Sequence, residues 1–193
     1  DVSTASYASI SFSIASQDTS PYALAFNTDG SKMFVLGYSN DAVYEYALSS
    51  AFDVSSASFT DSFSVTAQDT QPQGLAFNPT GTKMFVAGAI NAKISQYGLT
   101  TAFDVSTASY TNDFSTASQE TSPRSISFSP DGGKMFMVGY DSNAVNEYDL
   151  TTINAITSGY NPVHTTASID STYWTDINSM TADQAAGDGT INY

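Results

Sequence analysis

The chain has 193 residues and a formal net charge of −14, because 19 residues are Asp or Glu and only 5 are Lys or Arg. So few cations argue against binding to nucleic acids or to anionic membrane surfaces, which both need clustered positive charge. The absence of cysteine excludes disulfides and thiolate metal sites.

The first predicted element is a strand within residues 1–16. Phe12 is followed six residues later by the acid and hydroxyl pair Asp18-Thr19. The residues that hold the place of Phe12 further along the chain are Phe63, Phe114 and, in a weaker copy, His164. These segments alternate apolar and polar residues, which is typical of an outer strand with one face in water. We therefore expect residues 1–16 to be an outer strand without its own inner strands, and His164 to pack as the aromatic residues do.

Three repeats follow, each displaced by 51 residues from the last. Their landmarks are the prolines Pro21, Pro72 and Pro123, the glycines Gly30, Gly81 and Gly132, and the tripeptide Lys-Met-Phe at 32–34, 83–85 and 134–136. A fixed period of this length indicates a repeat architecture in which each unit packs against its neighbours. We place the repeats at about 22–67, 73–118 and 124–168, and we assign the glycines to hairpin turns.

Each repeat predicts four short strands. In the first strand of the first repeat, Leu24 and Phe26 alternate with alanines, as an innermost strand near a crowded axis requires. The second strand, 33–36, is apolar on both faces, which indicates that neighbouring sheets cover it.

The third strand is expected to be less buried than the second. It places Tyr46 on one face and the charged Glu45 on the other. The lysines that follow the hairpin turns are expected to face solvent: Lys32, Lys83 and Lys134.

Four-stranded antiparallel units of about 50 residues without helices are the blades of a β-propeller. The sequence therefore predicts an all-β partial propeller over residues 1–170, with three full blades plus one orphan outer strand. Closed propellers use at least about four blades. Either further blades lie outside this chain, or several chains complete the ring, or the arrangement stays open. Residues 171–193 break the pattern, so we expect them to begin another segment.

The motif Phe-Ser-Pro-Asp-Gly-Gly-Lys-Met-Phe at 128–136 resembles the blades of the YVTN and WD40-like propeller superfamily. The longer pattern, with Gln-Asp-Thr-Ser-Pro at 17–21 and Ala-Phe-Asp-Val-Ser at 51–55, resembles uncharacterised repeat proteins of marine viruses and bacteria. The resemblance covers residues 1–170. It implies the propeller fold and implies no activity.

One acid precedes the innermost strand of each unit: Asp18, Asp69, Glu120 and Asp170. A ring of such carboxylates could bind Ca²⁺ or sugar hydroxyls. Alternatively, each acid accepts hydrogen bonds from the backbone of its own turn. Repetition in every unit favours the second interpretation, so we predict no cofactor and keep Ca²⁺ only as an alternative.

Other candidate ligand-binding residues lie in loops. Asp41, Asn91 and Asp141 lie in the loops between the second and third strands. The residues of these loops differ from one repeat to the next, while the strands on either side recur, as is typical of binding loops. The aromatic residues that could stack on sugar rings, or could simply pack the loops, are Tyr22, Tyr38, Tyr140 and Trp174.

No nucleophile elbow, P-loop or histidine metal motif is present in the sequence. The small residues of the innermost strands are Ala, Gly and Ser, which argues against chemistry in a central channel. The Ser/Thr-rich, Lys-poor composition suits a protein outside a cell or on a virion surface. The sequence therefore predicts a non-enzymatic module that binds carbohydrate or protein. The alternatives are a self-assembling scaffold or filament component, and a propeller hydrolase or lyase whose site lies in missing blades.

Overall fold

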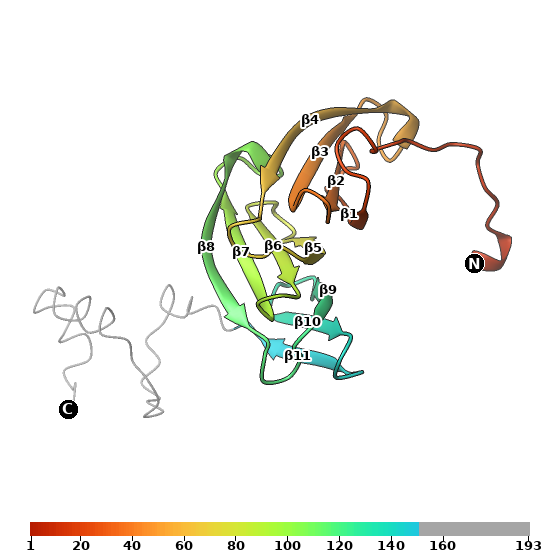
Figure 1. Cartoon of the computed structure of the whole chain (residues 1–193). Helices are drawn as coiled ribbons and strands as arrows, with labels where there is room; N and C mark the ends of the chain where they lie inside the picture. The colour runs from red at the N-terminus through yellow and green to blue at the C-terminus, as the bar shows by residue number, and fades with distance from the viewer. Residues whose placement is uncertain (151–193) are drawn as a thin grey trace, which may run out of the picture. The chain divides into compact units, whose positions relative to one another are not determined.

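The computed structural model describes residues 1–150, and every regular element in that range is a strand or a single 3-10 turn (Figure 1). Blade 1 consists of β1 (Pro21–Phe26), β2 (Lys32–Gly37), β3 (Ala42–Leu48) and β4 (Ala57–Ser64). Blade 2 consists of β5 (Pro72–Phe77), β6 (Lys83–Gly88), β7 (Lys93–Leu99) and β8 (Ala108–Ser115). The described part of blade 3 consists of β9 (Pro123–Phe128), β10 (Lys134–Gly139) and β11 (Val145–Asp149). The 3-10 turns are η1 (Val2–Thr4), η2 (Val54–Ser56) and η3 (Val105–Thr107). All strand pairs within a blade are antiparallel and follow chain order. The predicted all-β fold and the partial propeller are confirmed.

The innermost strands β1, β5 and β9 lie next to one another, and the three blades fan outward from them (Figure 1). Their close approach explains the small side chains of these strands. A Cβ atom on Gly74 of β5 would lie 2.7 Å from the backbone oxygen of Arg124 in β9. Blade 2 therefore requires glycine where it meets blade 3 at the axis.

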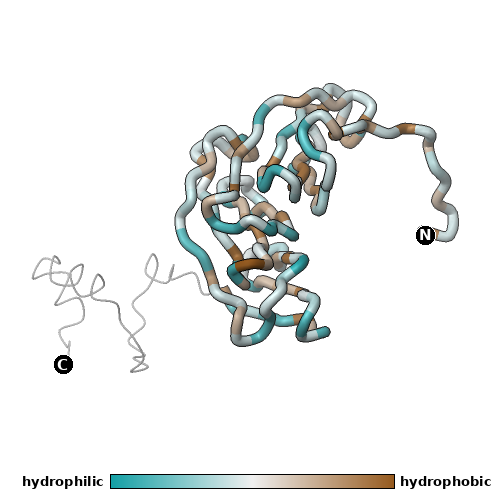
Figure 2. Tube along the Cα trace, viewed as in Figure 1, coloured by the Kyte–Doolittle hydropathy of each residue, from teal (hydrophilic) through white to brown (hydrophobic). Residues whose placement is uncertain are grey.

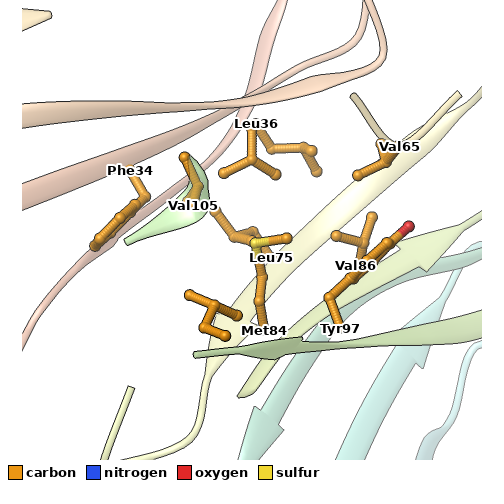
Figure 3. Close-up of a cluster of buried hydrophobic side chains, with 10 residues drawn as sticks. Phe34, Leu36, Val65, Leu75, Met84, Val86, Tyr97 and Val105 are labelled. Carbon is orange, nitrogen blue, oxygen red and sulfur yellow. The ribbon is translucent and has the colours of Figure 1, made fainter. Parts of the chain in front are cut away.

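The main core lies between blades 1 and 2, and its apolar side chains come from strands of both sheets (Figure 3). The outer strand β8 is largely hydrophilic along its trace (Figure 2), in agreement with its exposed side chains. A blade is covered only where it has a neighbour. Leu75 of blade 2 is 8% exposed, whereas its counterpart Leu24 of blade 1 is 59% exposed.

The hairpin between the first two strands of a blade depends on a glycine in a left-handed conformation. Gly30 has φ +72°, and a Cβ atom there would lie 2.3 Å from the ring of Phe52. The ring of Phe103 lies over Gly81 in the same way. These glycines therefore serve both the turn and the aromatic residue that packs on it.

The prediction that the third strand is less buried is wrong. Glu45 of β3 is buried because its side chain pairs with Lys32, with 2.6 Å between the Lys32 Nζ and Glu45 Oε1 atoms. Its second oxygen accepts a hydrogen bond of 2.9 Å from the backbone N–H of Val105, which belongs to the next blade. Lys32 in turn donates to the backbone oxygen of Phe103, at 2.7 Å, so it does not face solvent as expected. A charge in this strand can be buried because the neighbouring blade completes its hydrogen bonds.

Residues 5–14 have no assigned strand, although the sequence predicts an outer strand there. Within residues 1–150 they have no inner strand to pair with. Phe12 and Ile14 nevertheless pack on the open face of blade 1, and the Phe12 ring meets the Tyr46 ring edge-on with 5.3 Å between centroids. Phe63 meets Tyr97 with the same geometry and separation at the next junction.

The predicted fourth strand of blade 3, with His164, and the predicted extension at 171–193 lie outside the described residues. Within residues 1–150, no helix is both long and apolar enough to cross a membrane.

Candidate functional site

The acids that precede the innermost strands fix the loops at one end of the blades. Asp18 Oδ1 accepts hydrogen bonds from the backbone N–H groups of Ser20 (2.7 Å) and Ser39 (3.3 Å), and Oδ2 accepts one from Asn40 (3.0 Å). Asp69 accepts the equivalent three bonds in blade 2. Each carboxylate therefore ties the connector between two blades to the loop between the second and third strands. We call this arrangement the carboxylate latch.

Glu120 forms the latch of blade 3 with one more donor. Burial disfavours its charged form, but hydrogen bonds from the hydroxyl and N–H of Ser142, and from the N–H groups of Ser122 and Asp141, outweigh it and lower the pKa of Glu120 to about 2. The ionised carboxylate is thus the form that the fold requires.

Each latch closes over a glycine at the end of the second strand. A Cβ atom on Gly88 would lie 2.4 Å from the Asp69 carboxyl carbon, and Gly37 and Gly139 stand under Asp18 and Glu120 in the same way. Because backbone N–H groups occupy these carboxylate oxygens, the geometry favours the turn-fixing role over a calcium ring. Among residues 1–150 no three His, Asp or Glu side chains gather to hold a metal ion. Asp170 and Trp174 lie outside this range.

The three candidate loop residues do not occupy one structural position. Asp41, at the start of the third strand in blade 1, corresponds to Ala92 in blade 2, and both have a left-handed backbone. Asn91 lies one residue earlier in the turn, where its side chain donates to the backbone oxygen of Gln68 at 2.8 Å. Asp141 lies earlier still and accepts a bond from the Thr121 hydroxyl. The structure therefore does not bring these three residues into one site.

Asp41 differs from the latch acids in its surroundings. Its Oδ1 atom is buried and has no hydrogen-bond partner among the described residues. Burial, together with the nearby charges of Asp69 and Asp18, raises the pKa of Asp41. A half-buried carboxyl group with a raised pKa can exchange a proton more readily near neutral pH than an ordinary aspartate.

A second group of side chains lies at the same end of the blades, where the innermost strands begin. We call these five residues the strand-start row: Tyr22, Tyr38, Gln73, Arg124 and Tyr140. The rings of Tyr22 and Tyr38 stack with 4.8 Å between centroids. Arg124 donates from Nη1 to Gln73 Oε1 at 2.7 Å, and its guanidinium carbon lies 5.4 Å from the Tyr140 ring centroid.

Three of these residues hold one position in successive repeats. Tyr22, Gln73 and Arg124 each follow the repeated proline of the innermost strand. Gln73 is buried, while Arg124 is exposed, so the row presents a cation and aromatic rings on a fixed polar support. The Arg124 guanidinium can bind a carboxylate, phosphate or carbonyl oxygen, and the Tyr140 ring beside it can stack on the ring of a sugar-like ligand.

Sequence reasoning identified the tyrosines of this row but missed Gln73 and Arg124. The sequence did contain a signal for them: the residue after the repeated proline differs from one repeat to the next, although the proline itself does not change. Arg124 is also the only arginine in the chain.

A hollow of about 1090 Å³ lies between blades 2 and 3, lined by residues such as Phe85, Ile94 and Tyr148. At the junction of blades 1 and 2, the equivalent space is filled by Phe103 and Val105 of the turn that follows β7. The corresponding turn of blade 3 lies outside the described residues, so this hollow does not define a ligand site.

No family model matches the chain, and no curated protein matches it. Solved propellers do. One, from Bacteroides fragilis, is provisionally described as a 6-phosphogluconolactonase: it is 14% identical, the match covers 67% of this chain and 34% of that one, and the TM-score is 0.54. A periplasmic gluconolactonase from Pseudomonas aeruginosa is 16% identical, with coverage of 67% and 35% and a TM-score of 0.52. The β-propeller domain of Cps50 (Swd1) from Myceliophteria thermophila is 14% identical, with coverage of 68% and 38% and a TM-score of 0.51.

At these identities the likeness shows the fold alone, and the matched region spans about a third of the length of these structures. The enzymes among them nevertheless overturn the prediction of a non-enzymatic binding module. The prediction had weighed only the small residues in the middle of the innermost strands. Polar side chains stand at the starts of those strands, at Gln73 and Arg124.

Proposed function

We propose that these three blades are part of a propeller hydrolase that opens a lactone or a related sugar ester. The observation that carries this proposal is the exposed Arg124 guanidinium of the strand-start row, which is held by Gln73 and lies beside the Tyr140 ring. Two of the similar propellers are named as lactonases, which supports the reaction class. This is the hydrolase alternative of the sequence analysis, but with part of the binding surface proposed to lie in the described blades instead of in missing ones.

The roles follow from the chemistry of the side chains. Arg124 would bind an anionic group or the ring carbonyl oxygen, on which negative charge develops when water attacks a lactone. Tyr140 would support the sugar ring by stacking. Asp41 would exchange a proton with water or the leaving oxygen, because its pKa is raised. The remaining blades of such an enzyme would supply the rest of the pocket.

The test is hydrolysis of gluconolactone and its 6-phosphate by the full chain, followed as acid release above the spontaneous rate. Arg124→Gln should lower kcat/KM on the order of tenfold or more, because a charge-assisted contact is lost. Lys83→Gln is the matched control, since it removes the same charge from an exposed side chain at the hairpin end of the blades. Hydrolysis at the spontaneous rate for both lactones would contradict the proposal, and so would an equal effect of the two substitutions.

Several predictions from the sequence stay predictions. They are the extracellular or virion location, the likeness to marine repeat proteins, carbohydrate or protein partners, and the lack of a cofactor.

A further inference from the structure

We infer that the open face of blade 3 is a docking surface for blade 1 of a second copy of this chain, joined head to tail. Five residues make up the face of blade 3 on which no other described blade packs, and we call it the open face of blade 3: Lys134, Phe136, Val138, Val145 and Glu147. The open face of blade 1 carries the turn Phe52–Val54 and the exposed Leu24. The inference is independent of the proposed hydrolase activity.

The junction between blades 1 and 2 shows how such faces join. There Glu45 accepts the backbone N–H of Val105, and Lys32 donates to the backbone oxygen of Phe103. Phe34 of the same face packs against the rings of Phe77 and Phe103. One blade thus offers a lysine–glutamate pair beside apolar residues, and the next blade offers a Phe-Asp-Val turn.

Blade 3 repeats the first half of this junction. Lys134 and Glu147 stand where Lys32 and Glu45 stand, displaced by two repeats, and they form an ion pair. Phe136 and Val145 occupy the places of Phe34 and Val43. Val145 is 70% exposed, whereas Val43 is fully buried.

Blade 1 repeats the second half. Its turn, Phe52-Asp53-Val54, has the sequence of Phe103-Asp104-Val105, and Asp53 caps its 3-10 turn as Asp104 does. Phe52 is 58% exposed. Placed against blade 3, this turn would give Glu147 the N–H of Val54 and would give Lys134 the backbone oxygen of Phe52. The two open faces are therefore complementary in charge, hydrogen bonding and apolar surface.

The N-terminal segment supports the same contact. Phe12 and Ile14 already lie on blade 1 in the place that the outer strand of a preceding blade takes. In the head-to-tail pair, blade 3 of the second copy is that preceding blade, and Phe12 and Ile14 would lie between the two blades. Two copies would then join six blades, a number within the range of about 4 to 8 that closes a ring.

The first experiment is sedimentation of the full chain over a range of concentration at physiological salt, which screens the net charge. We expect a species of twice the 20.4 kDa chain mass. Glu147→Lys should raise the dissociation constant by about tenfold or more, because it sets two cations against each other in the contact. The control is Asp141→Lys, which makes the same change of charge in an exposed loop and should leave association unchanged. A 20.4 kDa monomer at every concentration would overturn the inference.

The second experiment uses the natural absence of cysteine. A chain with Val54→Cys is mixed with a chain with Glu147→Cys under mild oxidation. The head-to-tail contact predicts a disulfide-linked product of the mixture and little from either variant alone, because position 147 faces position 54 and not itself. Efficient linkage within the Glu147→Cys variant alone would show a tail-to-tail contact and would overturn the inference. Thermal unfolding of both variants verifies that they are folded.

Discussion

The same lysine–glutamate pair occurs on a covered face of blade 1 and on an open face of blade 3. The faces differ in what lies against them and in one added acid, since Lys134 also pairs with Asp149 where blade 1 has Ala47. The Glu45 side chain is 4% exposed and that of Glu147 is 52% exposed. In blade 1 the second carboxylate oxygen receives an N–H from the next blade, and in blade 3 it faces solvent. The comparison shows that burial in this fold is decided by the neighbouring blade more than by the residue itself.

The largest expected effect tests the apolar part of this comparison. Phe34→Ala should lower the free energy of unfolding by about 4 kcal/mol, because it leaves a cavity in the core between blades 1 and 2. Phe136→Ala, at the equivalent position on the open face, should cost about 1 kcal/mol, because only part of the ring is buried. Urea denaturation in dilute solution measures both. Equal losses would mean that the blade 3 face is covered even in the isolated chain.

The ion pair provides the next test. Glu45→Ala should cost about 3 kcal/mol, because it leaves the Val105 N–H and the Lys32 ammonium without their partner. Glu147→Ala should cost less than about 1 kcal/mol, because its pair is exposed to solvent. The same denaturation series compares them, and a Glu147→Ala loss as large as that of Glu45→Ala would contradict the comparison.

A single methyl group added under the carboxylate latch of blade 2 should break that latch. Gly88→Ala should cost about 2 kcal/mol, because the new Cβ atom displaces the Asp69 carboxylate from its N–H donors. Gly98→Ala in the neighbouring strand is the matched control, since its Cβ atom would approach nothing closer than 3.5 Å. Differential scanning calorimetry should show a lowered Tm for the first variant alone.

The smallest expected effect is the pH dependence of the latch in blade 3. The folded pKa of Glu120, about 2, lies below the ordinary value of 4.5, so its contribution to stability is complete above pH 4.5 and is lost as the pH falls toward 2. Glu120→Gln should be less stable than the parent chain at neutral pH, and the difference should shrink in acid. Unfolding measured by circular dichroism at several pH values between 7 and 3 tests this. A difference that is constant with pH would show that the charge of Glu120 does not matter.

The repeat alone was enough to predict the blades, because prolines, glycines and the Lys-Met-Phe tripeptide recur at fixed spacing and determine turns and strands locally. The burial of Glu45 could not be predicted from the strand pattern. Its partners Phe103 and Val105 follow a strand of the next blade and meet it only after the blades pack.

The strand-start row was predicted in part for a related reason. Exposed tyrosines in loops are visible in a sequence, whereas the contact between Arg124 and Gln73 joins residues one full repeat apart. The position after the repeated proline differs in every repeat, while the residues around it stay nearly constant. That variation was a better sign of a binding surface than the acids, which recur in every repeat.

The carboxylate latch also determines which pieces of the chain can be separated. Asp69 lies in the connector after blade 1 but is bonded to blade 2, while Val65 of the same connector donates its N–H to Asp41 of blade 1. A protease cut or a gene truncation between two repeats would therefore divide a cooperative unit that straddles the boundary. The hairpin between the first two strands, closed within its own blade, is the better place to open this chain for circular permutation.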